Sequence, residues 1–71
     1  MTQSLPSVTY ILRFIHTNGN VELVHHNTYD EAKEHYDLFD DSDADVYNAI
    51  ELIWYEWISQ TAKLVQRKTL S

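Results

Sequence analysis

The sequence predicts an α+β fold of order ββαββ, in which a four-stranded, mainly antiparallel sheet packs against one helix on one face. Three observations support this prediction: an alternating strand pair around an Asn-Gly turn, a capped helical segment after it, and a C-terminal third rich in β-branched and aromatic residues. We expect residues 7–71 to form a single small domain, preceded by a flexible arm over residues 1–6.

The first two strands are predicted from alternation along the chain. Two sets of side chains alternate in segment 8–15: Val8, Tyr10, Leu12 and Phe14 on one face, and Thr9, Ile11, Arg13 and Ile15 on the other. An Asn-Gly pair follows at residues 18–19, and it is the strongest short signal for a hairpin with a two-residue turn. Such a turn sets Phe14 opposite Leu23 in a second strand over residues 21–27, so Leu23 lies beside Phe14 and Val24 lies on the other face.

A helix is predicted over residues 29–40. Thr28 and Glu31 form a capping box, which satisfies free backbone amides where a helix starts. Three apolar residues then recur at helical spacing and should face the sheet: Ala32, Tyr36 and Phe39.

Residues 46–68 allow two interpretations. Five large residues are spaced to line one face of a long helix: Val46, Ile50, Ile53, Trp57 and Leu64. However, β-branched and aromatic residues dominate the segment 46–58, and these residues favour strands. We therefore prefer two strands, over residues 47–57 and 63–69, and keep ββα followed by a long C-terminal helix as the alternative.

The composition excludes several classes of protein. No cysteine is present, so neither a disulfide framework nor a thiolate zinc site is available. The N-terminal residues do not resemble a signal peptide, and no stretch approaches the roughly 18 apolar residues of a membrane span. We expect a cytoplasmic protein that does not bind membranes, in the host cytoplasm if a phage encodes it.

Negative charge is concentrated in the middle of the chain. The net charge is −6, and ten of the eleven acidic residues lie between Asp30 and Glu56, where Lys33 is the only base. An acidic body disfavours direct binding to nucleic acid, because that affinity depends on neutralising phosphates. A protein partner with a basic surface is the better match.

An alternation of Asp41, Asp43 and Asp45 imitates the start of a calcium loop. Such a loop needs glycine at its sixth position and a bidentate glutamate at its twelfth, where this chain has Val46 and Leu52. We therefore predict no metal site here. The four histidines show no convergence on one point that would suit zinc: His16, His25, His26 and His35.

The acidic residues of the helix and of the loop after it are the first candidate for partner binding. On a helix, residues three and four apart share a face, so Asp30, Glu34 and Asp37 form a stripe that Asp41 continues. The predicted partner-binding surface comprises Asp30, Glu34, Asp37, Asp40, Asp41, Asp43 and Asp45. Its charge spacing is comparable to that of phosphates along a nucleic-acid strand. Alternatively, the acids serve only solubility.

The second candidate is the sheet face that a single helix leaves uncovered. We expect it to bind a partner or a second copy through Ile11, Ile15, Val24, Ile53, Tyr55 and Trp57. In the alternative interpretation, long polar side chains such as Arg13 and Glu22 cover this face.

Catalysis has no support in the sequence. No serine lies in a glycine-flanked elbow, and the only glycine, Gly19, is used in the hairpin turn, so no phosphate-binding loop is available. We predict no enzymatic activity and no cofactor.

The size, the acidic charge and the hairpin–helix–strand layout together resemble small phage or mobile-element proteins that block host nucleic-acid machines, such as anti-CRISPR proteins and phage inhibitors of host RNA polymerase. No motif carries this resemblance, so it assigns no site residue. It implies an inhibitor or regulator that binds a basic, nucleic-acid-handling protein and mimics nucleic acid. The alternative is a structural or regulatory homodimer without an inhibitory role.

Overall fold

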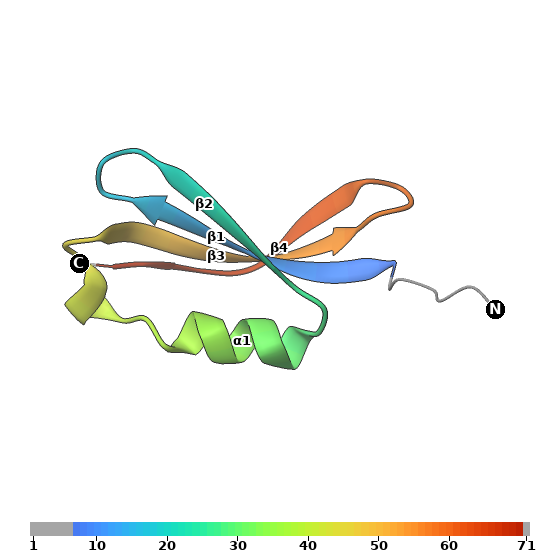
Figure 1. Cartoon of the computed structure of the whole chain (residues 1–71), viewed down its shortest axis with the longest axis horizontal. Coiled ribbons are helices and arrows are strands. Elements are labelled where there is room, and N and C mark those ends of the chain that lie inside the picture. The colour runs from blue at the N-terminus through green and yellow to red at the C-terminus, as the bar shows by residue number, and fades with distance from the viewer. Residues whose placement is uncertain (1–6, 71) are drawn as a thin grey trace.

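A computed structural model describes residues 7–70 and shows an α+β fold of order ββαββ, as the sequence predicts. The four strands pair in the order β2-β1-β3-β4, every pair is antiparallel, and one helix packs on one face (Figure 1). The elements are β1 (Val8–His16), β2 (Val21–His26), α1 (Tyr29–Asp37), the 3-10 helix η1 (Asp41–Asp43), β3 (Tyr47–Glu56) and β4 (Thr61–Thr69). The arm expected over residues 1–6 lies outside the described residues.

The hairpin between β1 and β2 closes with three loop residues instead of the predicted two. The His16 amide donates to the Asn20 carbonyl at 2.8 Å, and the Gly19 amide donates to the His16 carbonyl at 3.0 Å. Gly19 has a φ of 93°, which a glycine adopts without a steric penalty. An Asn-Gly pair is therefore compatible with two hairpin loops: a two-residue turn, and a three-residue loop whose last residue is left-handed.

This extra loop residue shifts the register by one and turns β2 over. Phe14 lies opposite Glu22 and Leu12 opposite Val24, so the predicted pairing of Phe14 with Leu23 is wrong. Because side chains alternate with a period of two, the shift exchanges the two faces of β2. Val24 packs against the core beneath the helix, which corrects its predicted place on the uncovered face.

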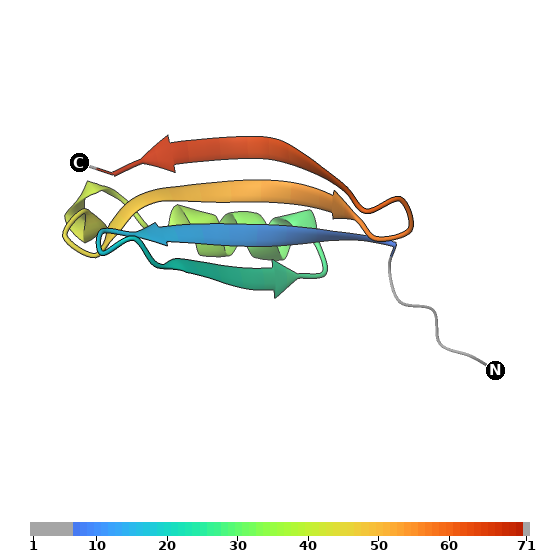
Figure 2. The ribbon, with the colours of Figure 1, turned by 90° about the horizontal axis from the view of Figure 1, so that it is seen from above.

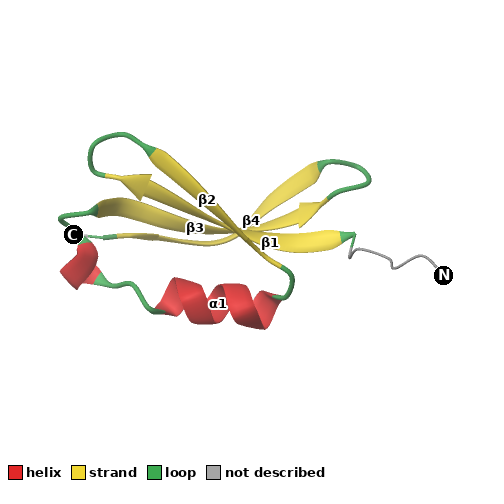
Figure 3. Cartoon of the chain, viewed as in Figure 1, coloured by secondary structure: helices red, strands yellow, loops and turns green. Residues whose placement is uncertain are grey.

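Helix α1 begins as predicted and ends at Asp37, earlier than the expected residue 40. At its start, the Thr28 hydroxyl accepts the Glu31 amide at 3.2 Å. Beyond its end, Asp40 is extended and caps η1: its carboxylate accepts the Ser42 amide at 2.9 Å, while the Asp43 carboxylate accepts the Asp40 amide at 3.1 Å (Figure 3). These side-chain bonds offer the backbone an alternative to another helical turn.

Residues 46–68 form two strands, so the alternative of a long C-terminal helix is wrong. β3 ends at Glu56, close to prediction, and β4 begins at Thr61, two residues before the expected position 63. A bulge interrupts their pairing, because Leu52 lies opposite Gln66 whereas Ile53 lies opposite Leu64. Val65 is the extra residue at this bulge.

The core lies between the helix and one sheet face. Seven buried residues form it: Leu12, Phe14, Ala32, Tyr36, Ile50, Leu52 and Leu70. The prediction that Ala32, Tyr36 and Phe39 face the sheet is confirmed, since the first two are buried and Phe39 packs against the cluster. No helix within residues 7–70 is long and apolar enough to cross a membrane.

Lys68 ties β4 to the end of the helix. Its ammonium donates to the Tyr36 carbonyl at 2.7 Å and to the Phe39 carbonyl, and it lies 4.2 Å from the centre of the Tyr36 ring. Burial lowers the pKa of Lys68, and nearby Asp37 opposes this effect. The side chain satisfies carbonyls that a helix end leaves open.

Candidate interaction surfaces

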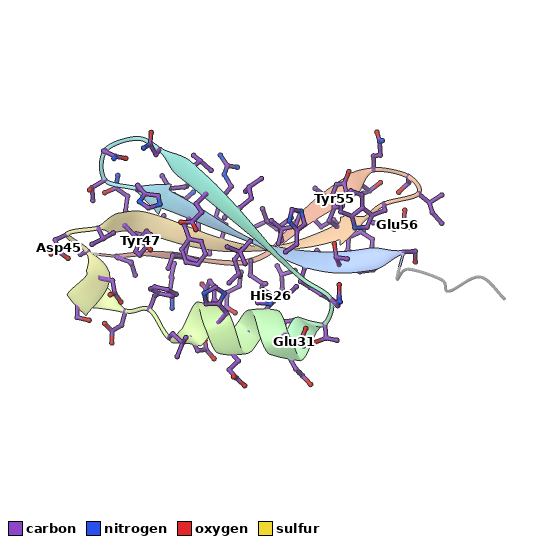
Figure 4. All side chains as sticks on the ribbon, in the orientation of Figure 1. His26, Glu31, Asp45, Tyr47, Tyr55 and Glu56 are labelled. Carbon is purple, nitrogen blue, oxygen red and sulfur yellow. The ribbon has the colours of Figure 1, made fainter. Side chains whose placement is uncertain are left out.

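The two predicted surfaces lie on opposite sides of the sheet. One is the acidic surface, comprising Asp30, Glu34, Asp37, Asp40, Asp41, Asp43 and Asp45, all located on α1 or in the connection after it. Six of these side chains are exposed and Asp43 is half-buried. Figure 4 shows the labelled Glu31 on α1 and the labelled Asp45 at the opposite end of this segment, where the chain returns to the start of β3. The structure therefore brings the predicted acidic residues together on one side of the molecule.

The carboxylates of the acidic surface differ in what they contact. Asp37 accepts from the Lys33 ammonium at 2.6 Å, and this contact raises the pKa of the lysine. Asp40 binds the Ser42 hydroxyl and amide, which lower the pKa of that carboxyl. Asp30 and Glu34 make no ion pair with any described residue. Asp30 and Glu34 are thus two carboxylates of α1 whose charge is not neutralised by an ion pair within residues 7–70.

A pair of histidines joins the helix to β2. His26 Nε2 and His35 Nδ1 lie 3.0 Å apart, and the His35 ring packs against Phe14 and Phe39. Burial lowers the pKa of His35, and the nearby His26 adds to this effect. Sequence reasoning missed this pair, because the two-residue turn would have placed His25 under the helix in place of His26.

The histidines and acids do not assemble a metal centre. Within residues 7–70, no three histidine, aspartate or glutamate side chains lie close enough together to hold a metal ion. Asp41 and Asp43, which imitate a calcium loop in the sequence, belong to η1, where Asp43 accepts a backbone amide.

The uncovered sheet face, called the open face below, carries the other predicted residues apart from Val24. Ile11, Ile15, Ile53, Tyr55 and Trp57 occupy alternate positions of β1 and β3 or follow β3 directly. Trp57 folds across this face: its indole N–H donates to the Thr9 hydroxyl at 2.8 Å, and its ring packs against Tyr55 and His25. Beside it Ile11 is only 9% exposed, whereas Trp57 itself is 47% exposed.

A row of charges crosses the middle of the open face. The Glu51 carboxylate lies 3.5 Å from the Arg13 guanidinium and 3.6 Å from that of Arg67. The carboxylate-bearing side chain is only 12% exposed, while both arginines are about half-exposed. One negative charge between two positive charges leaves one positive charge in excess.

Of the two polar residues expected to cover the open face, Arg13 lies on it and pairs with Glu51, whereas Glu22 does not lie on it. Glu22 lies opposite Phe14 on the helix side of the sheet, where its carboxylate is 3.3 Å from His16 Nε2. Glu51 and Arg67 were not predicted as site residues, since only the pairing of distant strands reveals that they meet.

Exposed apolar side chains lie along both edges of the sheet. On β2 they are Val21 and Leu23, and on β4 they are Leu64 and Val65, each about half exposed. Sequence reasoning missed Leu23 because the predicted register buried it. The apolar surface of the sheet is thus more exposed at its edges than at its centre.

The comparisons with known proteins do not identify the chain. No protein-family model, curated protein or solved structure matches it.

Proposed function

We propose that this protein is a small protein-interaction module whose acidic surface binds the basic surface of a nucleic-acid-handling protein and inhibits or regulates that protein. One observation carries the proposal. Segment 30–45 holds eight of the eleven acidic residues and a single base, and the fold gathers this segment on one side of the sheet.

The spacing of these charges supports a partner that normally binds phosphates. Asp30, Glu34 and Asp37 are spaced by four and three residues on α1, where such side chains lie about 5–6 Å apart, so they form a short line of negative charge. Because α1 ends at Asp37, Asp41 lies in η1 and does not continue this line on the helix, contrary to the prediction from the sequence. Like charges at this spacing destabilise a helix by a few tenths of a kcal/mol. A basic partner would offset this cost, and the summed field would speed its association.

A second candidate function is a homodimer formed through the open face. The half-exposed side chains of Leu23, Trp57 and Leu64 favour it, because large apolar side chains exposed on one face can be buried at an interface. Light scattering on the purified protein at several concentrations distinguishes a dimer from a monomer, and a monomer at all concentrations removes this candidate.

The proposed function is tested by capture from the cells that naturally make the protein. The immobilised protein is incubated with lysate at about 0.1 M salt, washed, and eluted at about 1 M salt, where the Debye length falls from about 10 Å to about 3 Å. We expect the eluted partner to be a nucleic-acid-binding protein whose nucleic-acid binding the purified module blocks in competition.

Two matched double variants separate the acidic surface from net charge alone. Asp30→Asn with Glu34→Gln removes two charges within the acidic surface, and Glu22→Gln with Glu56→Gln removes two charges outside it. We expect the first pair to weaken partner binding about tenfold and the second to change it less than about twofold. Equal losses would mean that only net charge is sensed, and unchanged binding of the first pair would reject the proposal.

A further inference from the structure

The outer edge of β4 is a long strand edge that pairs with no other strand of the described part of the chain. β4 pairs with β3 on one side only and runs for nine residues, against six in β2 at the opposite edge. Most of its side chains are exposed. Figure 2 shows α1 across the middle of the sheet and β4 at one border. Such an edge presents unpaired amide and carbonyl groups that can pair with another chain.

We propose that the outer edge of β4 accepts an extended, acidic segment of a partner protein as a fifth strand. The charge of β4 points to such an occupant, because it carries Lys63, Arg67 and Lys68 and no acidic residue. Lys68 is already bonded to the end of α1. The other two bases lie on opposite faces of the sheet, because Lys63 pairs with Trp54 on the helix side and Arg67 with Glu51 on the open face. Each remains available to the side chains of an incoming strand on its own face.

The surroundings of these two bases leave their charge largely uncompensated. Arg67 shares the Glu51 carboxylate with Arg13, so one guanidinium charge remains in excess beside the edge. Lys63 lies over the Trp54 ring, 5.3 Å from its centre, and forms no ion pair with a described residue. A carboxylate on a neighbouring strand would pair favourably with either base.

The same charges disfavour a second copy of this chain at the edge. β4 has three bases and no acid, so two β4 strands side by side gain no pairing of opposite charges, and any register that sets a base opposite a base is destabilised. Basic residues on an edge are a common device against self-association, and here they also select for an acidic occupant. Leu64 and Val65 are about half exposed at the centre of β4, so apolar residues between the acids of the occupant would gain contacts.

The backbone at the C-terminal half of β4 is oriented for this pairing. The Leu70 amide donates to the Asn48 carbonyl at 2.9 Å, in the same register that pairs Ile50 with Lys68 and Leu52 with Gln66. Because amides alternate in direction along an antiparallel strand, those of Arg67 and Thr69 point away from β3. These two amides are the groups that a fifth strand would bind.

Two synthetic peptides test the inference by NMR. Both are as long as β4, and they alternate valine with glutamate in one and valine with lysine in the other. We expect the glutamate peptide to bind at least about tenfold more tightly and to slow hydrogen exchange at the Arg67 and Thr69 amides. Equal binding of both peptides, or binding that leaves these amides unprotected, would overturn the proposal. So would self-association of the protein through β4.

Variants of the protein separate charge from backbone pairing. Arg67→Gln removes the charge and keeps the amide, whereas Thr69→Pro removes an outward amide and leaves the bonds to β3 in place. We expect each to weaken binding of the glutamate peptide about tenfold in protein whose circular dichroism is unchanged. Lys33→Gln, which removes a base from α1, is the matched control and should change binding less than about twofold. Unaltered binding in both β4 variants rejects the edge as the site. This outcome is independent of the acidic surface, because neither variant lies on it.

Discussion

The two faces of the sheet are shielded from solvent in different ways. On the helix side, Leu12, Ile50 and Leu52 are fully buried beneath α1. On the open face no second layer from residues 7–70 covers the strands, and the protection comes from the folded-over Trp57 and the charged row around Glu51. The first face is shielded by packing between elements, and the second by individual side chains lying across their neighbours.

This difference indicates which face of the sheet can contact a partner without unfolding the protein. Separating α1 from the sheet would expose the whole core, so the helix side is committed to stability. Displacing Trp57 would break one hydrogen bond and a few ring contacts, which a binding partner can replace. We therefore expect mutations on the helix side to act on folding, and mutations on the open face and its edges to act mainly on association.

The largest expected effect on stability is the difference between truncating two adjacent residues of β3 whose side chains point to opposite faces of the sheet. Leu52→Ala should lower the free energy of unfolding by about 3 kcal/mol, because it leaves a cavity in the core. Ile53→Ala on the half-buried open face should lower it by about 1 kcal/mol. Urea denaturation followed by circular dichroism measures both. Equal losses would contradict the distinction between the faces.

The next effect concerns the link between β4 and the helix. Lys68→Met keeps much of the aliphatic stem but leaves the Tyr36 and Phe39 carbonyls without their ammonium donor, so we expect a loss of about 2 kcal/mol. Lys63→Met, which removes a base without a backbone partner, is the matched control and should cost less than about 0.5 kcal/mol. If the two variants unfold at the same urea concentration, Lys68 does not stabilise the helix end.

On the open face, Trp57→Phe should lower the free energy of unfolding by about 1 kcal/mol, since the indole donor to Thr9 is lost while an aromatic ring remains. Thr9→Val removes the acceptor, and in its presence the Trp57 substitution should cost less. Simple additivity of the two substitutions in urea denaturation would show that the hydrogen bond contributes nothing. A dye that binds exposed apolar surface should bind the Trp57→Phe variant more strongly.

The parts of the fold that the sequence predicts correctly have local signals. Thr28 marks the helix start, because its hydroxyl accepts the Glu31 amide as one half of the predicted capping box, and the spacing of Ala32 and Tyr36 identifies the buried side. The β-branched and aromatic residues of β3 distinguish a strand from a helix. In each case the deciding interactions lie within a few residues along the chain.

The differences between prediction and structure have three causes: one additional loop residue, the pairing of distant strands, and local side-chain bonds after the helix. An Asn-Gly pair does not reveal whether the hairpin loop has two or three residues, and that choice decides the faces of Val24 and His26. The meeting of Arg13, Glu51 and Arg67 requires the pairing of three strands, which no local pattern contains. Helix length was overestimated because Asp40 and Asp43 bond the backbone locally.

The smallest expected effect is a pH dependence that acts on the helix side alone. The folded protein lowers the pKa of His35 from its ordinary value of 6.5, so the unfolded chain binds this proton more readily. The free energy of unfolding should therefore be unaffected well above pH 6.5 and fall as the pH drops below that value. The free energy of unfolding becomes constant again at a pH low enough to protonate His35 in the folded protein as well. Urea denaturation between about pH 7.5 and pH 5 measures this slope.

Substitutions at three histidines show on which face of the sheet the group lies that makes the free energy of unfolding depend on pH. His35→Gln should flatten it, and His26→Gln should reduce it, because the second imidazole adds to the lowering of the His35 pKa. His25→Gln, beside Trp57 on the open face, should leave the slope unchanged. Asp40 and Glu56 have pKa values lowered from 3.8 and 4.5, so their stabilisation is lost only at more acidic pH and does not overlap this window. A slope that persists in the His35 variant would mean that the pair between β2 and α1 does not sense pH.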